Sequence, residues 1–438
     1  MRAILLSILA WVIVGCGGAS SSGSDSNGSS STIDAIFSTF GIGIGMGGAF
    51  AFDDGSGNPI WLSSSDLILN EQIDKVERYQ KISKFDGDAF KSLQSKLKNS
   101  KYIVYWITKN WEENWIDATE LQKVMDAGYI PVFNYWYFGD ELVGGLPDDA
   151  KIDEYYKHNQ KLSTYLQKLH GKKIVIIEPE FNKDILIEHS TKEQQIAFAK
   201  VLGNAIDTIK ASVSDTLFSI SMIDTGRRGT TQTSAECGYS SCALGDKEIW
   251  AKAENIYNTL LSKLDFVSFS EMLGQFSRDD DNPGDYNNPN PKAYTIDEMG
   301  MNELDSRVSN IAKFMNEKYK KPVFLSHIAI ATATWSDTNS DGAIDDSELD
   351  MNGWSSIANS FYSNIISKKD ELLTNGLFGL AVMELFDNPQ HDKGGYQYFI
   401  NNEYHLGIVE TSAVDETDQY LMGDIVPKGN IVDVLFSE

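Results

Sequence analysis

The stretch KIVIIEPEFN, residues 173–182, joins a short run of β-branched and apolar residues to two closely spaced glutamates. A run of this length and composition is typical of a strand buried on both faces of a sheet. Comparable runs recur at residues 41–45, 102–107, 130–135, 217–222, 266–270, 323–328 and 378–384. The sequence therefore predicts eight buried strands. The first is the weakest, because three of its five residues are glycines and a glycine-rich loop is the alternative there.

Helix-like segments separate these runs along most of the chain. Residues 118–127, 191–211, 249–264, 304–320 and 354–373 carry apolar residues at helical spacing, with charged residues between them. Strands joined by such long crossovers pair in parallel, and eight of them match a closed (β/α)8 TIM barrel. The length of 438 residues would suit about two to three average domains. Because the alternation continues almost to the end, we predict instead a single barrel domain over residues 34–438, enlarged by loop insertions.

The N-terminal segment indicates export and lipidation. The apolar run at residues 4–14 follows Arg2 and is too short to span a bilayer, so residues 1–15 are predicted to be a signal peptide. The run ends at Cys16 in a sequence that resembles the lipobox of bacterial lipoproteins, where the cysteine carries the lipid. Residues 16–33 then form the lipidated cysteine and a Ser- and Gly-rich tether. We expect an exported lipoprotein at the outer membrane or cell surface; a secretory peptide followed by a linker is the alternative.

The charge and the remaining cysteines narrow the partners. A formal net charge of -26 repels phosphate backbones, so nucleic acid is excluded as an expected partner. Cys237 and Cys242 stand close together, and in an exported protein such a pair most often forms a disulfide. The same spacing without a nearby histidine is a poor zinc site. The expected partners are therefore a polysaccharide or oligosaccharide and, through Cys16, a membrane.

Aromatic residues follow two neighbouring predicted strands. In a TIM barrel the functional residues lie at the C-terminal ends of the strands and in the loops after them. Trp106 and Trp111 stand at the end of one strand, and Tyr135 and Trp136 at the end of the next. Such rings suit the stacking of sugars, so we predict that these four residues bind substrate. The alternative for each ring is packing against a helix.

Two carboxylates stand together at the end of the fourth predicted strand. Because side chains alternate along a strand, Glu178 and Glu180 are expected to share a face. Their repulsion would raise the pKa of one toward the range of a general acid. The alternative is that one of them pairs with a cation and the other is solvated.

Several quoted runs resemble glycoside hydrolase family 26 and its relatives in the clan of retaining (β/α)8 glycosidases. YIVYWITKNW at residues 102–111 and AGYIPVFNYW at residues 127–136 are similar to the second and third strands of that family. FGLAVMELFD at residues 378–387 and EYHLGIV at residues 403–409 are similar to the eighth strand and the segment after it. The family's Glu-x-Asn signature matches Glu180 and Asn182. The resemblance implies that Glu180 is the acid/base and that Asn182 lies at the substrate.

One departure from the family concerns the nucleophile. KPVFLSH at residues 321–327 is similar to the seventh strand, and His327 stands where the clan has a glutamate. Other strand ends offer Glu271 and Glu384 as the second carboxyl group, and Asp224 as a weaker candidate. His327 would then orient or bind the substrate.

These observations predict a glycoside hydrolase that acts on a polysaccharide such as a β-mannan or β-glucan type chain. Its mechanism would use two carboxyl groups, with Glu180 as general acid/base and its partner among Glu384, Glu271 and Glu178. One alternative is a catalytically inactive barrel that serves as a surface glycan-binding lipoprotein. Another is that residues 321–327 do not correspond to the family's seventh strand, so that the second catalytic carboxyl group lies elsewhere in the sequence.

The stretch DTNSDGAIDDSE, residues 337–348, fits the calcium-loop pattern D-x-[DN]-x-[DN]-G-x5-E at every fixed position. The glycine permits the sharp turn that such a loop needs, and the oxygen atoms around it can wrap one ion. No long amphipathic helix precedes the loop, so we predict a structural Ca²⁺ in a barrel crossover. An ordinary acidic turn is the alternative. The expected ligands are Asp337, Asn339, Asp341, the carbonyl of Ala343, Asp345 and Glu348.

Overall fold

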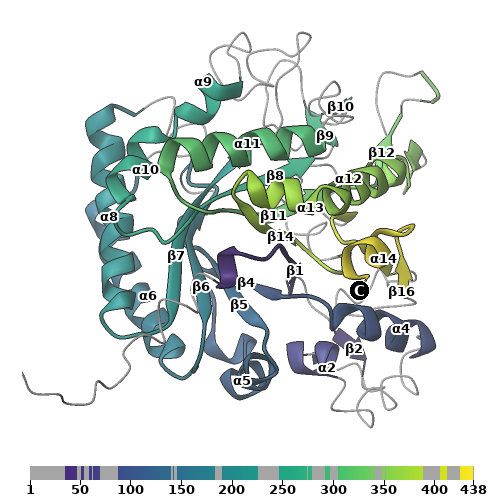
Figure 1. Cartoon of the computed structure of the whole chain (residues 1–438), viewed down its shortest axis with the longest axis horizontal. Coiled ribbons are helices and arrows are strands. Elements are labelled where there is room, and N and C mark those ends of the chain that lie inside the picture. The colour runs from purple at the N-terminus through teal and green to yellow at the C-terminus, as the bar shows by residue number, and fades with distance from the viewer. Residues whose placement is uncertain are drawn as a thin grey trace, which may run out of the picture.

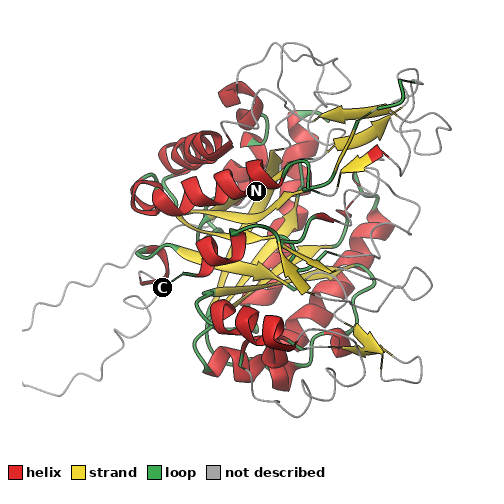
Figure 2. Ribbon diagram, turned by 90° about the vertical axis from the view of Figure 1, so that its right-hand side faces the viewer, coloured by secondary structure: helices red, strands yellow, loops and turns green. Residues whose placement is uncertain are grey.

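A computed structural model shows a closed barrel of parallel strands surrounded by helices (Figures 1 and 2). It describes residues 35–46, 51–53, 59–61, 63–69, 87–139, 142, 146–182, 190–224, 246–273, 275–278, 292–295, 304–336, 338–340, 348–350, 352–387, 405–411 and 425–437. Among these residues, no helix is both long and apolar enough to cross a membrane.

The barrel contains all eight predicted strands. In chain order they are β1 (Gly41–Gly45), β4 (Tyr102–Thr108), β5 (Ile130–Trp136), β6 (Lys173–Pro179), β7 (Thr216–Asp224), β8 (Val267–Leu273), β11 (Val323–Ile330) and β14 (Leu377–Val382). Their order around the barrel is β1-β14-β11-β8-β7-β6-β5-β4, and β1 pairs with β4 to close it. Every neighbouring pair is parallel. The predicted (β/α)8 TIM barrel is confirmed.

Helices cover the outside of the barrel. They are α4 (Gly87–Leu97), α5 (Ala118–Asp126), α6 (Asp149–Leu166), α8 (Lys192–Lys210), α9 (Asp246–Ala251), α10 (Glu254–Leu260), α11 (Leu304–Tyr319), α12 (Ser355–Ser367) and α13 (Lys369–Thr374). Two predicted helices are each divided, into α9 with α10 and into α12 with α13. Lys368 has a non-helical backbone and separates α12 from α13. The helical spacing of apolar residues continues across Lys368, so the sequence pattern did not predict this break.

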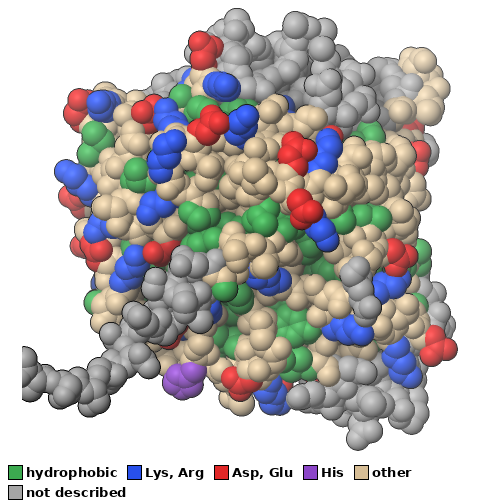
Figure 3. Space-filling view, in the orientation of Figure 1, with side chains coloured by type: hydrophobic (Ala, Val, Ile, Leu, Met, Phe, Trp, Pro, Cys, Tyr) green, Lys and Arg blue, Asp and Glu red, His purple; other side chains and the backbone are tan. Residues whose placement is uncertain are grey.

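Smaller elements decorate the barrel. The short helices are α2 (Ser64–Ile68), the 3₁₀ turn η1 (Glu113–Trp115) and α14 (Ile431–Phe436). Four pairs of short strands form two-stranded sheets: β2 (Ala51–Asp53) with β3 (Pro59–Trp61), β9 (Gln275–Arg278) with β10 (Lys292–Thr295), β12 (Thr334–Trp335) with β13 (Leu349–Asp350), and β15 (Val409–Thr411) with β16 (Ile425–Pro427). On the face visible in Figure 3, basic and acidic side chains are interspersed.

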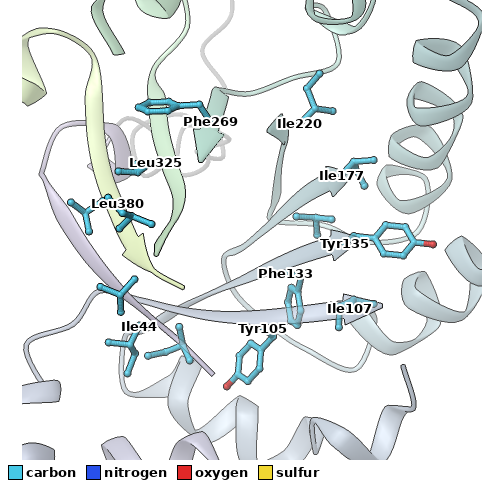
Figure 4. Packing of buried hydrophobic residues seen from close by; sticks show 14 of the residues in the cluster. Ile44, Tyr105, Ile107, Phe133, Tyr135, Ile177, Ile220, Phe269, Leu325 and Leu380 are labelled. Carbon is cyan, nitrogen blue, oxygen red and sulfur yellow. The ribbon is translucent and has the colours of Figure 1, made fainter. Parts of the chain in front are cut away.

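The core has two layers that follow from strand alternation. Side chains such as Phe133, Tyr135 and Ile177 pack between the barrel wall and the helices (Figure 4). The residues between them point into the barrel, where Val104, Val132, Ile174, Ile176, Phe324 and Phe378 form a second apolar cluster. Phe37 covers that cluster, with its ring 4.9 Å from the ring of Phe378. The N-terminal end of the barrel is therefore filled with apolar side chains, which leaves the C-terminal end for polar residues.

The glycine-rich run at residues 41–45 is the strand β1 and not a loop. Glycine is needed there because the neighbouring strands leave no space for larger side chains. A Cβ atom on Gly45 would lie 1.6 Å from the carbonyl oxygen of Met383, and one on Gly43 would lie 2.9 Å from the Cβ of Ala381. Gly43 pairs with both Ala381 of β14 and Tyr102 of β4. These glycines allow β1 to close the barrel tightly.

We predict that Gly45→Ala lowers the free energy of unfolding by about 1–3 kcal/mol, because a methyl group there forces the β1 and β14 backbones apart. Urea unfolding of the variant and of the exposed control Ser38→Ala measures the change. A denaturation midpoint equal to that of the control would contradict the tight packing at this position.

Candidate active site

The centre of the site is a contact between Glu180 and His327 across the barrel interior. Glu180 follows β6 and His327 belongs to β11, and two strands lie between them in the barrel order. The Oε1 atom of Glu180 lies 3.2 Å from the Nε2 atom of His327. His327 is fully buried and Glu180 is 6% exposed. The centroid of the Trp106 ring, from β4, lies 5.0 Å from that of His327. Residues from three strands thus meet at one point.

Both members of this pair sit where their strand leaves regular register. The β6–β7 register shifts between Ile177 and Pro179, and the β11–β8 register shifts between Leu325 and His327. In addition, Glu178 and Glu180 have φ angles of 45° and 66°, in the left-handed region that favours glycine. Bulges and such backbone outliers gather at functional sites, where they re-aim side chains. The local backbone therefore identifies this end of the barrel as the candidate active site.

Glu178 does not share a face with Glu180, so this prediction is wrong. Its carboxylate accepts hydrogen bonds of 2.8–3.4 Å from the backbone N–H groups of Tyr137, Phe138 and Gly139. Burial mainly raises the pKa of Tyr155, and the charge of Glu178 raises it further. Glu178 therefore faces the helix side, because the bulge in β6 breaks the alternation. It anchors the chain after β5 and is not a catalytic candidate.

Glu271 and Asp224 also face away from the barrel interior. They are register partners in β8 and β7, and the Asp224 carboxylate accepts two hydrogen bonds of 3.0 Å from Arg307 of α11. In β8, Glu271 alternates in phase with Phe269 and Leu273, which pack in the helix-facing core. These two carboxylates belong to the wall between the strands and the helices. The prediction that Glu271 or Asp224 supplies the second catalytic carboxyl group is therefore wrong.

Glu384 is the remaining predicted candidate for the second carboxyl group. It lies two residues after the end of β14, is 2% exposed, and forms an isolated bridge with Met46, the residue after β1. Both strands end at the same edge of the barrel as β6 and β11. Among the predicted candidates, Glu384 therefore stays a prediction as the second carboxyl group.

The four predicted aromatic ligands divide into two pairs. Trp106 and Trp136 point into the barrel, with ring centroids 6.1 Å apart in an edge-to-face arrangement. Gly139 allows this, because a Cβ there would lie 3.0 Å from the Trp136 ring. Trp111 and Tyr135 instead pack against α6, which corrects their prediction as substrate ligands. The Trp111 ring lies 5.1 Å from that of Tyr165, and the Tyr135 hydroxyl lies 2.9 Å from Nδ1 of His158.

Asn182 holds the backbone beside Glu180. Its side chain donates to the carbonyl of Ile223 at 2.9 Å and accepts from the N–H of the same residue at 2.6 Å. The amide therefore imitates one more residue of the β6–β7 ladder. The resemblance implies that Asn182 lies at the substrate, and the structure corrects this. Asn182 has a positioning role instead, because it fixes the segment that carries Glu180.

Buried serines support the other side of the pair. The Ser326 hydroxyl lies 3.4 Å from Nδ1 of His327 and 2.8 Å from the hydroxyl of Ser221, and it donates to the carbonyl of Phe269. A hydrogen bond between Glu180 and His327 requires a proton on one of the two facing atoms. An acid that is held by an imidazole and shielded from water can donate its proton to a leaving oxygen.

Most of the predicted calcium ligands lie outside the described residues. These are Asp337, Asp341, Ala343 and Asp345, and Cys16, Cys237 and Cys242 also lie outside them. Glu348 is described, and its Oε1 atom accepts from the N–H groups of Thr338 and Asn339 at 2.7 and 3.2 Å. The ladder of β12 with β13 brackets the loop. Within the described part of the chain, no three His, Cys, Asp or Glu side chains form a metal site.

Sequence reasoning did not select Asn134 or the serines as site residues. Asn134 lies between two inward-facing positions of β5, and Ser221 and Ser326 face the same interior. A signal was available, because a polar residue that alternates with apolar ones in a fully buried strand has to face the inside of the barrel.

We predict that His158 makes stability depend on pH. Burial mainly, with a contribution from Lys161, lowers its pKa to about 4 from 6.5. Between pH 6.5 and 4, His158 is therefore protonated in the unfolded chain and neutral in the folded chain. The free energy of unfolding falls as the pH decreases over this range. Urea unfolding over this range should show a smaller loss for His158→Gln than for the exposed control His170→Gln. Equal losses in the two variants would contradict the assignment.

No family model and no curated protein matches the chain. Among solved structures, it is similar to the β-glucosidase from Thermotoga maritima in complex with deoxynojirimycin, at 14% identity and a TM-score of 0.48, covering 91% of this chain and 99% of that one. A family 1 β-glucosidase from the same organism gives the same values. The monomer of a hyperthermophilic β-glucosidase mutant gives 12% identity, a TM-score of 0.49 and coverage of 91% and 99%. These neighbours are glycosidases, and the likeness is one of barrel fold.

Proposed function

We propose that this protein is a glycoside hydrolase whose active site lies inside the C-terminal end of the barrel. The observation that carries the proposal is the buried Glu180–His327 contact beside two inward-facing tryptophans. A proton held at a carboxyl group next to aromatic rings is what cleavage of a glycosidic bond requires. The rings hold the sugar, and the acid protonates the oxygen that leaves.

In this proposal Glu180 is the general acid and Glu384 is the second carboxyl group. A sugar ring contacts Trp106 and Trp136, and Glu180 gives its proton to the glycosidic oxygen. If Glu384 lies about 5–5.5 Å from Glu180, it attacks the anomeric carbon as the aglycone leaves, and the ionised Glu180 regains its proton from the water that then hydrolyses the glycosyl-enzyme bond. If the two carboxyl groups lie about 6.5–9.5 Å apart, Glu384 takes the proton of the attacking water, and both groups return to their starting states by exchange with solvent. His327 holds Glu180 in position. A β-mannan or β-glucan type chain is the proposed substrate.

A second candidate function is glycan binding without cleavage. The observation in its favour is His327, which stands where the resembling clan has its nucleophile and contacts the proposed acid directly. In that case the same tryptophans bind the sugar and no bond is broken. The placement at a membrane through Cys16 belongs to both candidates and stays a prediction from the sequence.

We predict that Glu180→Gln lowers the rate of hydrolysis of a β-linked glycan by about 10²- to 10⁴-fold, because glutamine cannot donate a proton to the leaving oxygen. Reducing-end release from glucomannan measures this rate, and calorimetric titration with mannotetraose measures binding, which should persist. The surface variant Glu254→Gln is the matched control, since Glu254 pairs with Lys318 on the outside of the barrel. Full activity of Glu180→Gln would refute the role of Glu180. Binding without product in the wild type would favour the second candidate.

We also propose that residues 337–348 bind a structural Ca²⁺. The donor set supports this, because every fixed position of the loop carries an oxygen ligand or the turn glycine. In the described part, Glu348 already folds its carboxylate back over the start of the loop. The ion would tie the crossover between β11 and α12 and take no part in chemistry.

Removal of calcium should therefore lower the melting temperature and leave the chemical step unchanged. An ion present at about 100 times its Kd stabilises a fold by about 2.7 kcal/mol. Calorimetric scans with Ca²⁺ and with a chelator measure the difference. Asp341→Ala should abolish it, whereas Asp350→Asn, outside the ligand positions, should keep it. Equal melting temperatures with and without the chelator would count against the ion.

A further inference from the structure

Asn134 is a buried amide without a hydrogen bond. It is fully buried, and neither its Oδ1 nor its Nδ2 atom has a hydrogen-bond partner. Its neighbours in β5 settle its direction. Phe133 and Tyr135 pack toward the helices, while Val132 belongs to the cluster inside the barrel. The amide of Asn134 therefore points into the barrel interior.

The amide lies beside the Glu180–His327 pair. Asn134 is the register partner of Trp106, whose ring packs on His327, and of Ile176, which precedes Glu180 by four residues. The indole N–H of Trp106 is also buried and without a hydrogen-bond partner. Two neighbouring strands thus bring two unsatisfied polar groups to the part of the barrel interior that holds the proposed acid.

Unsatisfied groups of this kind call for a ligand. Buried side-chain polar atoms are almost always hydrogen-bonded, and one that is not destabilises the fold. A leucine has the same branching at Cγ as asparagine, carries no polar atom and would remove that cost. Keeping an amide at this position is therefore useful if a polar molecule enters and completes its hydrogen bonds.

The chemistry of the two groups selects the ligand. The amide offers a donor and an acceptor, and the indole offers a donor. A sugar hydroxyl both donates and accepts, so it satisfies Oδ1 and Nδ2 together. A carboxylate or sulfate only accepts and would leave Oδ1 unsatisfied. A site that hydrogen-bonds a hydroxyl discriminates strongly against ligands that lack it.

We infer that Asn134 and Trp106 form a subsite for the hydroxyl groups of a neutral sugar ring, held beside the Glu180–His327 pair. The inference rests on the proposed function and deepens it, because it selects neutral hexose chains over uronic acid chains as the substrate class. The amide takes a ring hydroxyl, and the net charge of -26 disfavours a chain of anionic rings. Asn134 is then a specificity-determining residue, and the indole N–H of Trp106 assists it.

The chain contains a matched control. Asn159 of α6 is also fully buried, and both polar atoms of its amide lack partners. It lies in the helix layer, outside the barrel interior. Asn134→Leu and Asn159→Leu therefore remove the same kind of group from inside and outside the proposed subsite.

The experiment compares the wild type, Asn134→Leu and Asn159→Leu in thermal melts and in calorimetric titrations with mannotetraose, cellotetraose and trigalacturonate. Both leucine variants should fold and melt close to the wild-type temperature, because losing the unsatisfied amide offsets the cost of the larger side chain. Only Asn134→Leu should lose affinity for the neutral oligosaccharides, by at least tenfold. Trp106→Phe, which removes the indole N–H and keeps an aromatic ring, should weaken the same binding several-fold and tests the subsite if Asn134→Leu does not fold.

Three results would overturn the inference. Unchanged binding of the neutral oligosaccharides by Asn134→Leu, or by Trp106→Phe where Asn134→Leu is unfolded, would overturn the subsite while the proposed hydrolase stands. Preference of the wild type for trigalacturonate would overturn the neutral class. Failure of the wild type to bind any of the three oligosaccharides would overturn the proposed function together with the subsite, which separates that failure from the first.

Discussion

The site depends on one physical constraint, which is that a carboxyl group buried inside a barrel needs a polar partner. Glu180 meets His327 at 3.2 Å across the interior, and both residues lie at shifts in strand register. Without the bulge in β11, strict alternation would turn the side chain of His327 toward the helices. The left-handed backbone of Glu180, the amide ladder of Asn182 and the serine beneath His327 all serve to hold this contact.

The rest of the barrel is packed so that the Glu180–His327 contact lies at its C-terminal end. Its N-terminal end is filled by aromatic and branched side chains, with Phe37 packed on Phe378 as a cover. The glycines of β1 let this strand approach its neighbours closely. Polar residues then gather at the other end, where Trp106 and Trp136 provide apolar walls. Strand alternation separates the inside of the barrel from the helix side, since each strand contributes to both layers.

Sequence patterns predicted the barrel well because its strands are short apolar runs between helices, and burial on both faces makes such runs conspicuous. They also located Glu180 and His327 at strand ends. They failed where local geometry overrides alternation. Glu178 faces the helix side because of a bulge that no residue type announces, and Trp111 turns back onto α6 after its strand ends. Glu271 was expected inside although the alternation of β8 places it in the wall.

The most direct test of the account is a crystal structure of Glu180→Gln soaked with mannotetraose. The account predicts a sugar ring against Trp106 and Trp136, with a glycosidic oxygen within hydrogen-bond distance of residue 180 and Glu384 on the other side of the anomeric carbon. A sugar bound only on the outer surface, or no sugar in the barrel at saturating concentration, would contradict it.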